Sequence, residues 1–185
     1  MGYYVTIKES TFQIPKENLD KAYEAMCELN HTVPNKDKGG GSYPGKDKAP
    51  YSGPDKSCWF SWMAWNYHEI CKDANDILEH LGFETSYDAE GNLCIEWYDS
   101  KTGQESLFLE SICSLSKGYI VWQGEQDEVW GETYGGSEVI VKSRLAPDYS
   151  DLVDTQTIQE VTVELVEDAA LVGISTAGLL PEGTD

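Results

Sequence analysis

The sequence predicts an α+β fold, in which a mainly antiparallel sheet carries about three helices on one face. Segments that alternate polar and apolar residues and are rich in β-branched and aromatic types indicate strands. Segments whose apolar residues recur every three or four positions indicate amphipathic helices. Short turn sequences join several of the strands, which favours antiparallel pairing. We therefore expect the order β-α-α-ββ-α-βββ, followed by an acidic C-terminal extension.

The first strand and the first helix are predicted near the N-terminus. Residues 3–14 alternate in polarity and contain many β-branched and aromatic side chains, which is typical of a strand. In residues 16–30, Leu19, Tyr23 and Met26 recur at spacings of four and three, which places them on one face of a helix.

A long irregular loop is predicted over residues 31–57. It holds four prolines and five glycines, is rich in lysine and has no periodicity. Loops of this length are usually functional or mobile.

The second and third helices and five further strands follow. Residues 71–83 repeat apolar side chains at helical spacing, and Gly82 is a typical helix end. Residues 83–99 contain two alternating arms around the turn "AEGN", which predicts a β-hairpin. Residues 103–116 have one apolar helical face. Residues 118–143 predict three short strands joined by "GEQD" and "GGSE".

The chain divides by composition into a domain and an extension. We expect residues 1–143 to form a single α+β domain. Residues 144–185 are turn-rich at first, and then alternate valine and leucine with acidic residues. We expect this segment to be an acidic extension that is partly ordered.

The net charge of −20 is the strongest global signal. Residues 1–57 are neutral overall, whereas residues 58–143 carry −12 and residues 144–185 carry −8. A field of this sign repels nucleic acid and anionic membranes, and it attracts basic surfaces. A solvated acidic surface that serves solubility is the alternative. Because no apolar run is long enough to span a membrane, we expect a cytoplasmic protein.

Motifs for catalysis and for metal binding are missing from the sequence. No GxSxG, GxxxxGK[ST] or HExxH pattern occurs, and Arg144 is the only arginine that could bind phosphate or carboxylate groups. Four side chains of metal-ligand type lie close together in the sequence, namely Cys58, His68, Cys71 and His80. Their spacing matches no common zinc signature. We therefore expect no catalytic residue, no metal and no cofactor, with the cysteines as mostly buried thiols.

The aromatic stretch "CWFSWMAWNY", residues 58–67, has three interpretations. Large rings normally pack in a core, where each buries roughly 150–250 Å². Tryptophans are also enriched at protein–protein interfaces, and rings can stack on sugars or bases. We expect most of the stretch to be core, with one or two rings displayed. The candidate anchors for a partner are Trp59, Trp62 and Trp65.

Acidic side chains in two segments form the candidate partner-binding surface. The first segment, "GEQDEVWGE", contributes Glu125, Asp127, Glu128, Trp130 and Glu132. The second, "DYSDLVD", contributes Asp148, Asp151 and Asp154. Carboxylates in a row can imitate the phosphates of a duplex, whose charges follow each other at about 3.4 Å per strand.

Four segments within residues 1–143 resemble a known group of proteins. The segments are "MGYYVTIKESTFQIPKENLDKAYEAMCELN", "WFSWM", "DILEHLGFE" and "GYIVWQGEQDEVW". They resemble a family of small acidic proteins carried by phages and by bacteria of gut-type communities. The resemblance implies no catalytic residue, because no activity is established for that family. It implies a context, since small acidic phage proteins without catalytic motifs often inhibit host defence, as anti-CRISPR proteins do.

Together these observations favour a non-enzymatic acidic binding protein. We expect a phage-type inhibitor of a basic, nucleic-acid-handling host-defence complex such as a CRISPR nuclease. It would contact a basic protein surface, without binding nucleic acid or membrane directly. The alternative is a small ligand-binding or regulatory domain, with an aromatic pocket lined by Trp59, Trp62 and Trp97. An enzyme of unknown chemistry is a third hypothesis, for which the sequence offers no motif.

Overall fold

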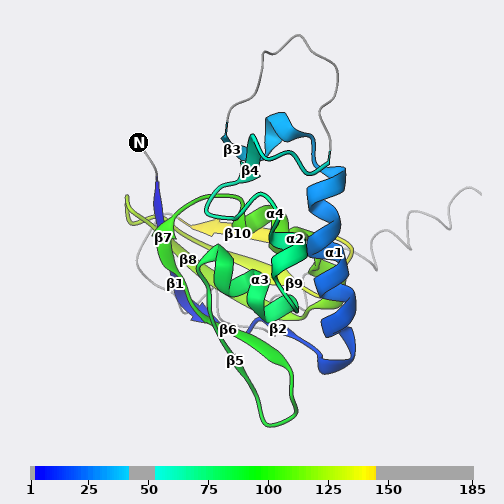
Figure 1. The fold of residues 1–185 in the computed structure, drawn as a ribbon. Helices are drawn as coiled ribbons and strands as arrows, with labels where there is room; N and C mark the ends of the chain where they lie inside the picture. Colours follow the sequence, from blue (N-terminus) through cyan, green and yellow to red (C-terminus); the bar gives the residue numbers. More distant parts are fainter. Residues whose placement is uncertain (1–2, 42–52, 145–185) are drawn as a thin grey trace, which may run out of the picture. The chain divides into compact units, whose positions relative to one another are not determined.

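A five-stranded antiparallel sheet is the largest element of the computed structural model, which describes residues 3–41 and 53–144 (Figure 1). Its strands, in order across the sheet, are β10 (Ile140–Arg144), β9 (Val129–Tyr134), β8 (Gly118–Gly124), β1 (Tyr4–Ser10) and β7 (Asp99–Lys101). Each neighbouring pair is antiparallel. The α+β fold with antiparallel sheets that the sequence predicts is therefore confirmed.

Two smaller sheets complete the strands of the described residues. The three-stranded sheet consists of β2 (Gln13–Ile14), β6 (Leu93–Trp97) and β5 (Glu84–Tyr87), in that order. In it, β5 and β6 form the hairpin that the sequence predicts. The two-stranded sheet pairs β3 (Gly39–Gly41) with β4 (Cys58–Phe60).

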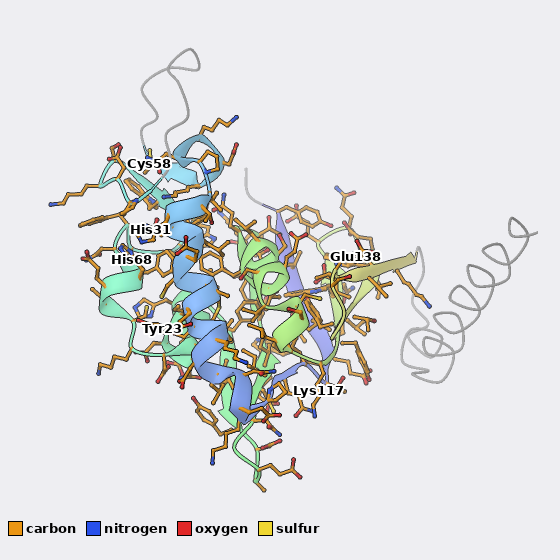
Figure 2. The ribbon with its side chains drawn as sticks, turned by 90° about the vertical axis from the view of Figure 1, so that its right-hand side faces the viewer. Tyr23, His31, Cys58, His68, Lys117 and Glu138 are labelled. Carbon is orange, nitrogen blue, oxygen red and sulfur yellow. The ribbon has the colours of Figure 1, made fainter. Side chains whose placement is uncertain are left out.

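The described residues contain four α-helices and three 3-10 helices. The α-helices are α1 (Leu19–Thr32), α2 (Tyr67–Ile70), α3 (Ala74–Leu81) and α4 (Glu105–Ser111), and the 3-10 helices are η1 (Lys16–Asn18), η2 (Asn35–Asp37) and η3 (Cys113–Leu115). The blue α1 and the green α4 lie on the same side of β1 and β10 (Figure 2). The hydrophobic core forms between this side of the sheet and the helices, where Ile7, Trp122, Met26 and Phe108 are all buried.

The ends of α3 show how local sequence sets an element. Asp73 is the N-cap, and its Oδ1 accepts the backbone N–H of Asp76 at 2.9 Å. Gly82 follows the last turn with φ of 101°, a left-handed conformation that glycine adopts without a steric penalty. The helix therefore ends where the sequence predicts.

The predicted strand over residues 3–14 is two strands in different sheets. The pairing of β1 with β8 shifts register between Ile7 and Glu9, which marks a bulge. The chain then bends, and β2 pairs with β6 in the three-stranded sheet. Alternation continues across the bend, so the sequence pattern alone does not reveal the change of sheet.

The loop predicted over residues 31–57 is wrong at its N-terminal end, because α1 continues to Thr32 and further regular structure follows. Its first part contains η2 and β3, and its last residues lead directly into β4. Three glycines in a row allow β3 to approach its partner closely, because a Cβ on Gly41 would lie 2.0 Å from the carbonyl oxygen of Ser57. Lys38 is completely buried there, and its Nζ donates to Asn30 O (2.9 Å), Asn30 Oδ1 (2.8 Å) and Gly53 O (2.8 Å).

Some expectations fall outside the described residues. Residues 42–52, in the middle of the predicted loop, and residues 145–185, which make up nearly all of the expected acidic extension, belong to this part of the chain. Among residues 3–41 and 53–144, no helix has the length and apolar character that a membrane span requires.

Candidate functional site: an acidic aromatic groove

Two adjoining pockets lie along α4 where it runs beside β9. The first has a volume of about 220 Å³ and is lined by Val5, Thr102, Gly103, Glu105, Ser106, Trp122, Trp130 and Glu132. The second has a volume of about 170 Å³ and is lined by Ser106, Glu110, Glu132, Tyr134, Val139 and Val141. Because Ser106 and Glu132 line both pockets, we treat them as one site and name it the α4–β9 groove.

Strand alternation places the key side chains of the groove on one face. Trp130, Glu132 and Tyr134 are two residues apart on β9, so their side chains project from the same side of the sheet. In register, Trp130 lies opposite Trp122 and Glu132 lies opposite Ile120. Trp122 and Ile120 are both buried in the core. The groove is thus a part of the helix-covered face that α4 leaves accessible.

Glu132 accepts hydrogen bonds from three neighbouring side chains. Its Oε2 accepts from Trp122 Nε1 at 2.9 Å and from the Tyr134 hydroxyl at 2.7 Å. Its Oε1 accepts from Trp130 Nε1 at 3.2 Å. These neutral donors fix the orientation of the carboxylate, but they do not cancel its charge. Burial and the nearby Glu132 carboxylate raise the pKa of Tyr134, so its hydroxyl stays protonated as a donor.

Glu105 supplies a second carboxyl group to the groove from the first turn of α4. It is only 8 % exposed, and its Oε2 accepts the backbone N–H of Gly103 at 2.6 Å. Burial raises the pKa of Glu105 above its ordinary value, and the negative charge of Glu132 raises it further. The fold therefore holds two carboxyl groups of the same sign close enough to repel each other.

The charge of the groove has no cationic partner among the described side chains. Among residues 3–41 and 53–142, no lysine ammonium group lies within 4.0 Å of a carboxylate oxygen. The ion pair that these residues do form joins His68 to Glu69. A half-enclosed pocket with unpaired carboxylates and aromatic walls can bind a cationic group.

Apart from Glu132, the acids predicted for partner binding lie at the β8–β9 turn or beyond the described residues. Glu125 and Asp127 are exposed at the turn, and Glu128 is half-buried beside them. Local hydrogen bonds orient two of them, since Asp127 accepts from Gln123 (3.0 Å) and Glu128 accepts from the backbone of Gln126 (3.0 Å). Asp148, Asp151 and Asp154 lie outside the described residues.

The remaining two predicted residues of this hairpin, Trp130 and Glu132, point into the α4–β9 groove. Trp130 and Glu132 project from the same face of β9, and Glu128 lies directly before this strand. The acidic turn and the groove residues of β9 therefore follow each other along the chain.

The candidate anchors Trp59, Trp62 and Trp65 do not form one platform. Trp59 is 38 % exposed and packs on Gly40, while Lys56 places its ammonium group 5.1 Å from the ring of Trp65. Trp62 is 58 % exposed, has φ of 69° and donates its Nε1 proton to Lys101 O at 3.2 Å.

Other large side chains of the aromatic stretch belong to the core. Phe60, Met63 and Tyr67 are buried, and Phe60 and Tyr67 both pack edge-to-face on Phe108 of α4. The stretch is a short strand followed by turns, which explains why neither a helical nor a strand period fits all of its rings. The tryptophans of the described groove come from β8 and β9, and Trp97 lies exposed on β6.

The four side chains of metal-ligand type do not come together as a metal site. Cys71 Sγ lies 3.7 Å from His80 Nδ1, but His80 Nδ1 also contacts Asp76 O at 2.7 Å. His68 instead contacts Asn30 through its Nδ1 at 2.8 Å. Burial raises the pKa of the Cys71 thiol to about 11, so it is not an activated nucleophile. Within the described part of the chain, no group of three or more His, Cys, Asp or Glu side chains could hold a metal ion.

Glu105 and Trp122 are among the groove residues that the sequence did not single out. Both lie in segments whose pattern predicts core elements, and nothing local distinguishes Glu105 from the other acids. An acid in the first turn of a helix is common in any case, because it complements the helix dipole.

Comparisons with protein-family models, with curated proteins and with solved structures found no match.

Proposed function

We propose that the protein is a non-enzymatic binding protein that occupies a basic surface of another protein. The observation that carries the proposal is the pairing of Glu105 and Glu132 in an aromatic groove, next to the acidic β8–β9 turn and without a cationic partner in the described residues. Keeping the buried carboxyl group of Glu105 beside the half-buried carboxylate of Glu132 costs free energy. A cation from a partner would offset that cost, so binding a cationic group at this site lowers the free energy of the protein.

The proposed partner is a nucleic-acid-handling host-defence complex, such as a CRISPR nuclease, and the protein would act as a phage-type inhibitor of it. Such nucleases carry positively charged channels for their substrates. The net charge of −20 would steer association with such a channel at rates that fall as ionic strength rises.

The experiment is a pull-down of purified CRISPR nucleases on the immobilised protein at increasing salt. We expect capture at low salt that weakens steeply as salt is raised. The triple variant Glu125→Gln, Asp127→Asn, Glu128→Gln should reduce capture at least about tenfold, because it removes the negative charges of the turn.

A matched control removes three charges elsewhere. Glu17, Asp20 and Glu24 are exposed in η1 and α1, and their amide variants should leave capture nearly unchanged. Capture that does not respond to salt, or equal losses in the two triple variants, would contradict recognition by the acidic turn.

The pocket volume of about 220 Å³ favours a second candidate function, that of a small ligand-binding or regulatory domain. A ligand that binds only the native state raises its stability by RT ln(1 + [L]/Kd). A thermal-shift screen of small molecules that carry no cationic group therefore separates the two functions, since only a ligand-binding domain should be stabilised by such a molecule without a protein partner.

A further inference from the structure

The two carboxyl groups of the α4–β9 groove retain acceptor capacity that no residue in the described part of the chain uses. An ionised carboxylate offers about four acceptor sites on its two oxygens. Glu132 accepts hydrogen bonds from Trp122, Trp130 and Tyr134. The side chain of Glu105 accepts a hydrogen bond from the backbone N–H of Gly103. A cationic donor with several N–H groups would fill these sites and also compensate the charge.

A flat aromatic surface lies next to these acceptors. The indoles of Trp122 and Trp130 stack with centroids 6.3 Å apart and planes inclined by 20°. Trp130 is half-buried, and both rings line the first pocket together with Glu105 and Glu132. The carboxylate of Glu132 fixes both rings, so this wall of the pocket is in place before a ligand arrives.

We propose that the α4–β9 groove is a subsite for a guanidinium group, namely an arginine side chain of the protein partner. The inference rests on the proposed function and names the chemistry that the groove recognises. A guanidinium is planar, presents five N–H donors in a fixed fork and stacks on aromatic faces. It is also more weakly hydrated than an ammonium, so it enters a half-enclosed pocket at a lower desolvation cost than lysine does.

The experiment follows the indole N–H resonances of the ¹⁵N-labelled protein by NMR during titration with N-acetyl-arginine amide. We expect the Trp122 and Trp130 signals to move with saturation, because both indoles line the pocket. N-acetyl-lysine amide should bind at least about tenfold more weakly, and the neutral isostere N-acetyl-citrulline amide should leave both signals in place. An acetylated and amidated Gly-Arg-Gly peptide should bind at least as well as N-acetyl-arginine amide, because neither carries a carboxylate that the groove would repel.

The variant Glu105→Gln keeps the size of the side chain and its acceptor for Gly103, but removes the charge. It should weaken binding of the arginine amide about tenfold or more, which corresponds to the loss of a charge-assisted hydrogen bond. Glu28→Gln is the control, because it removes one charge from the exposed face of α1. Equal binding of arginine, lysine and citrulline amides, or shifts confined to the other tryptophans, would overturn the proposal.

The two proposals fail in different ways. Nuclease capture that depends on the turn acids, together with no shift of Trp122 or Trp130 by arginine amide, would refute the subsite and leave the binding function standing. Saturable arginine binding without capture of any nuclease would refute the proposed partner and leave the subsite standing.

Discussion

Trp122 on β8 and Trp130 on β9 are register partners whose stacked indoles both donate their Nε1 protons to the carboxylate of Glu132. One side chain thereby orients two rings from different strands. Tyr134 donates to the same group, so three aromatic residues of the sheet depend on a single acceptor. The groove is therefore rigid on its sheet side because of hydrogen bonds as well as packing.

Glu132→Ala should lower the free energy of unfolding by about 2–4 kcal/mol. The substitution leaves the donors of Trp122, Trp130 and Tyr134 without their acceptor, and buried unsatisfied donors cost about 1–3 kcal/mol each. Urea denaturation measures the change. Thr133→Ala, on the opposite face of β9, is the control and should cost less than about 1 kcal/mol. A loss below about 1 kcal/mol for Glu132→Ala would show that water replaces the carboxylate without penalty.

Glu105→Gln should be more stable than the wild type at neutral pH, and this advantage should shrink at acidic pH. The pKa of Glu105 in the folded protein is raised above the unfolded value of about 4.3, because the carboxyl is buried near Glu132. Between these two pKa values the native state binds more protons than the unfolded state, so the contribution of Glu105 to stability falls as pH rises.

The measurement is the difference in unfolding free energy between Glu105→Gln and the wild type from pH 4 to pH 7. This difference should grow in favour of the variant as pH rises through the pKa of Glu105 in the folded protein. Glu28→Gln, on the exposed face of α1, is the control for the loss of one surface charge. If the difference between Glu105→Gln and the wild type does not change with pH, Glu105 has the same pKa in the folded and the unfolded protein.

Lys38→Met should destabilise the protein by about 2 kcal/mol or more. Methionine fills a similar volume, but it leaves Asn30 O, Asn30 Oδ1 and Gly53 O without a donor. Burial lowers the pKa of Lys38, which shows that its charge is costly to bury, so the lost hydrogen bonds must outweigh the relief from that cost. Thermal and urea unfolding test this balance, with exposed Lys36→Met as the control. A neutral or stabilising effect would mean that desolvation dominates.

Gly118→Ala should cost more stability than Gly82→Ala. Both glycines have positive φ, 96° and 101°, so each substitution incurs a left-handed penalty of about 1–2 kcal/mol. A Cβ on Gly118 would also lie 2.2 Å from Thr11 O, whereas on Gly82 the nearest atom is Tyr98 Cε2 at an ordinary 3.5 Å. Parallel denaturation of the two variants isolates the steric contribution, and equal losses would mean that the backbone at Thr11 yields freely.

The elements with strong local signals were predictable from the sequence. Helix α3 begins after Asp73 and ends before Gly82, as the sequence pattern predicts. The turn at 89–92 joins β5 to β6, also as predicted. The edge strand β7 was not predicted, because Asp99–Lys101 is polar and short and gains its strand geometry only by pairing with β1. The pairing of Gly39–Gly41 was missed for a related reason, since glycine carries no side-chain pattern.

The candidate site was predictable only in part. Trp130 and Glu132 stand out in the sequence as an acid beside a large ring on a predicted strand. Glu105 joins them only because α4 packs on the sheet, and such a long-range contact leaves no trace in local periodicity. The same holds for Lys38, whose place in a lysine-rich segment suggests solvent exposure although the structure buries it.

The shared carboxylate of Glu132 gives the molecule an optical reporter of its own. The emission of an indole depends on the hydrogen bond of its nitrogen and on nearby charge, and here one anion sets both conditions for Trp122 and Trp130. A cation that docks beside Glu132 should change the fluorescence of these two rings together. Binding of a cation to the α4–β9 groove could then be followed by intrinsic fluorescence, without an attached dye, in the wild type and in the Glu105→Gln and Glu28→Gln variants.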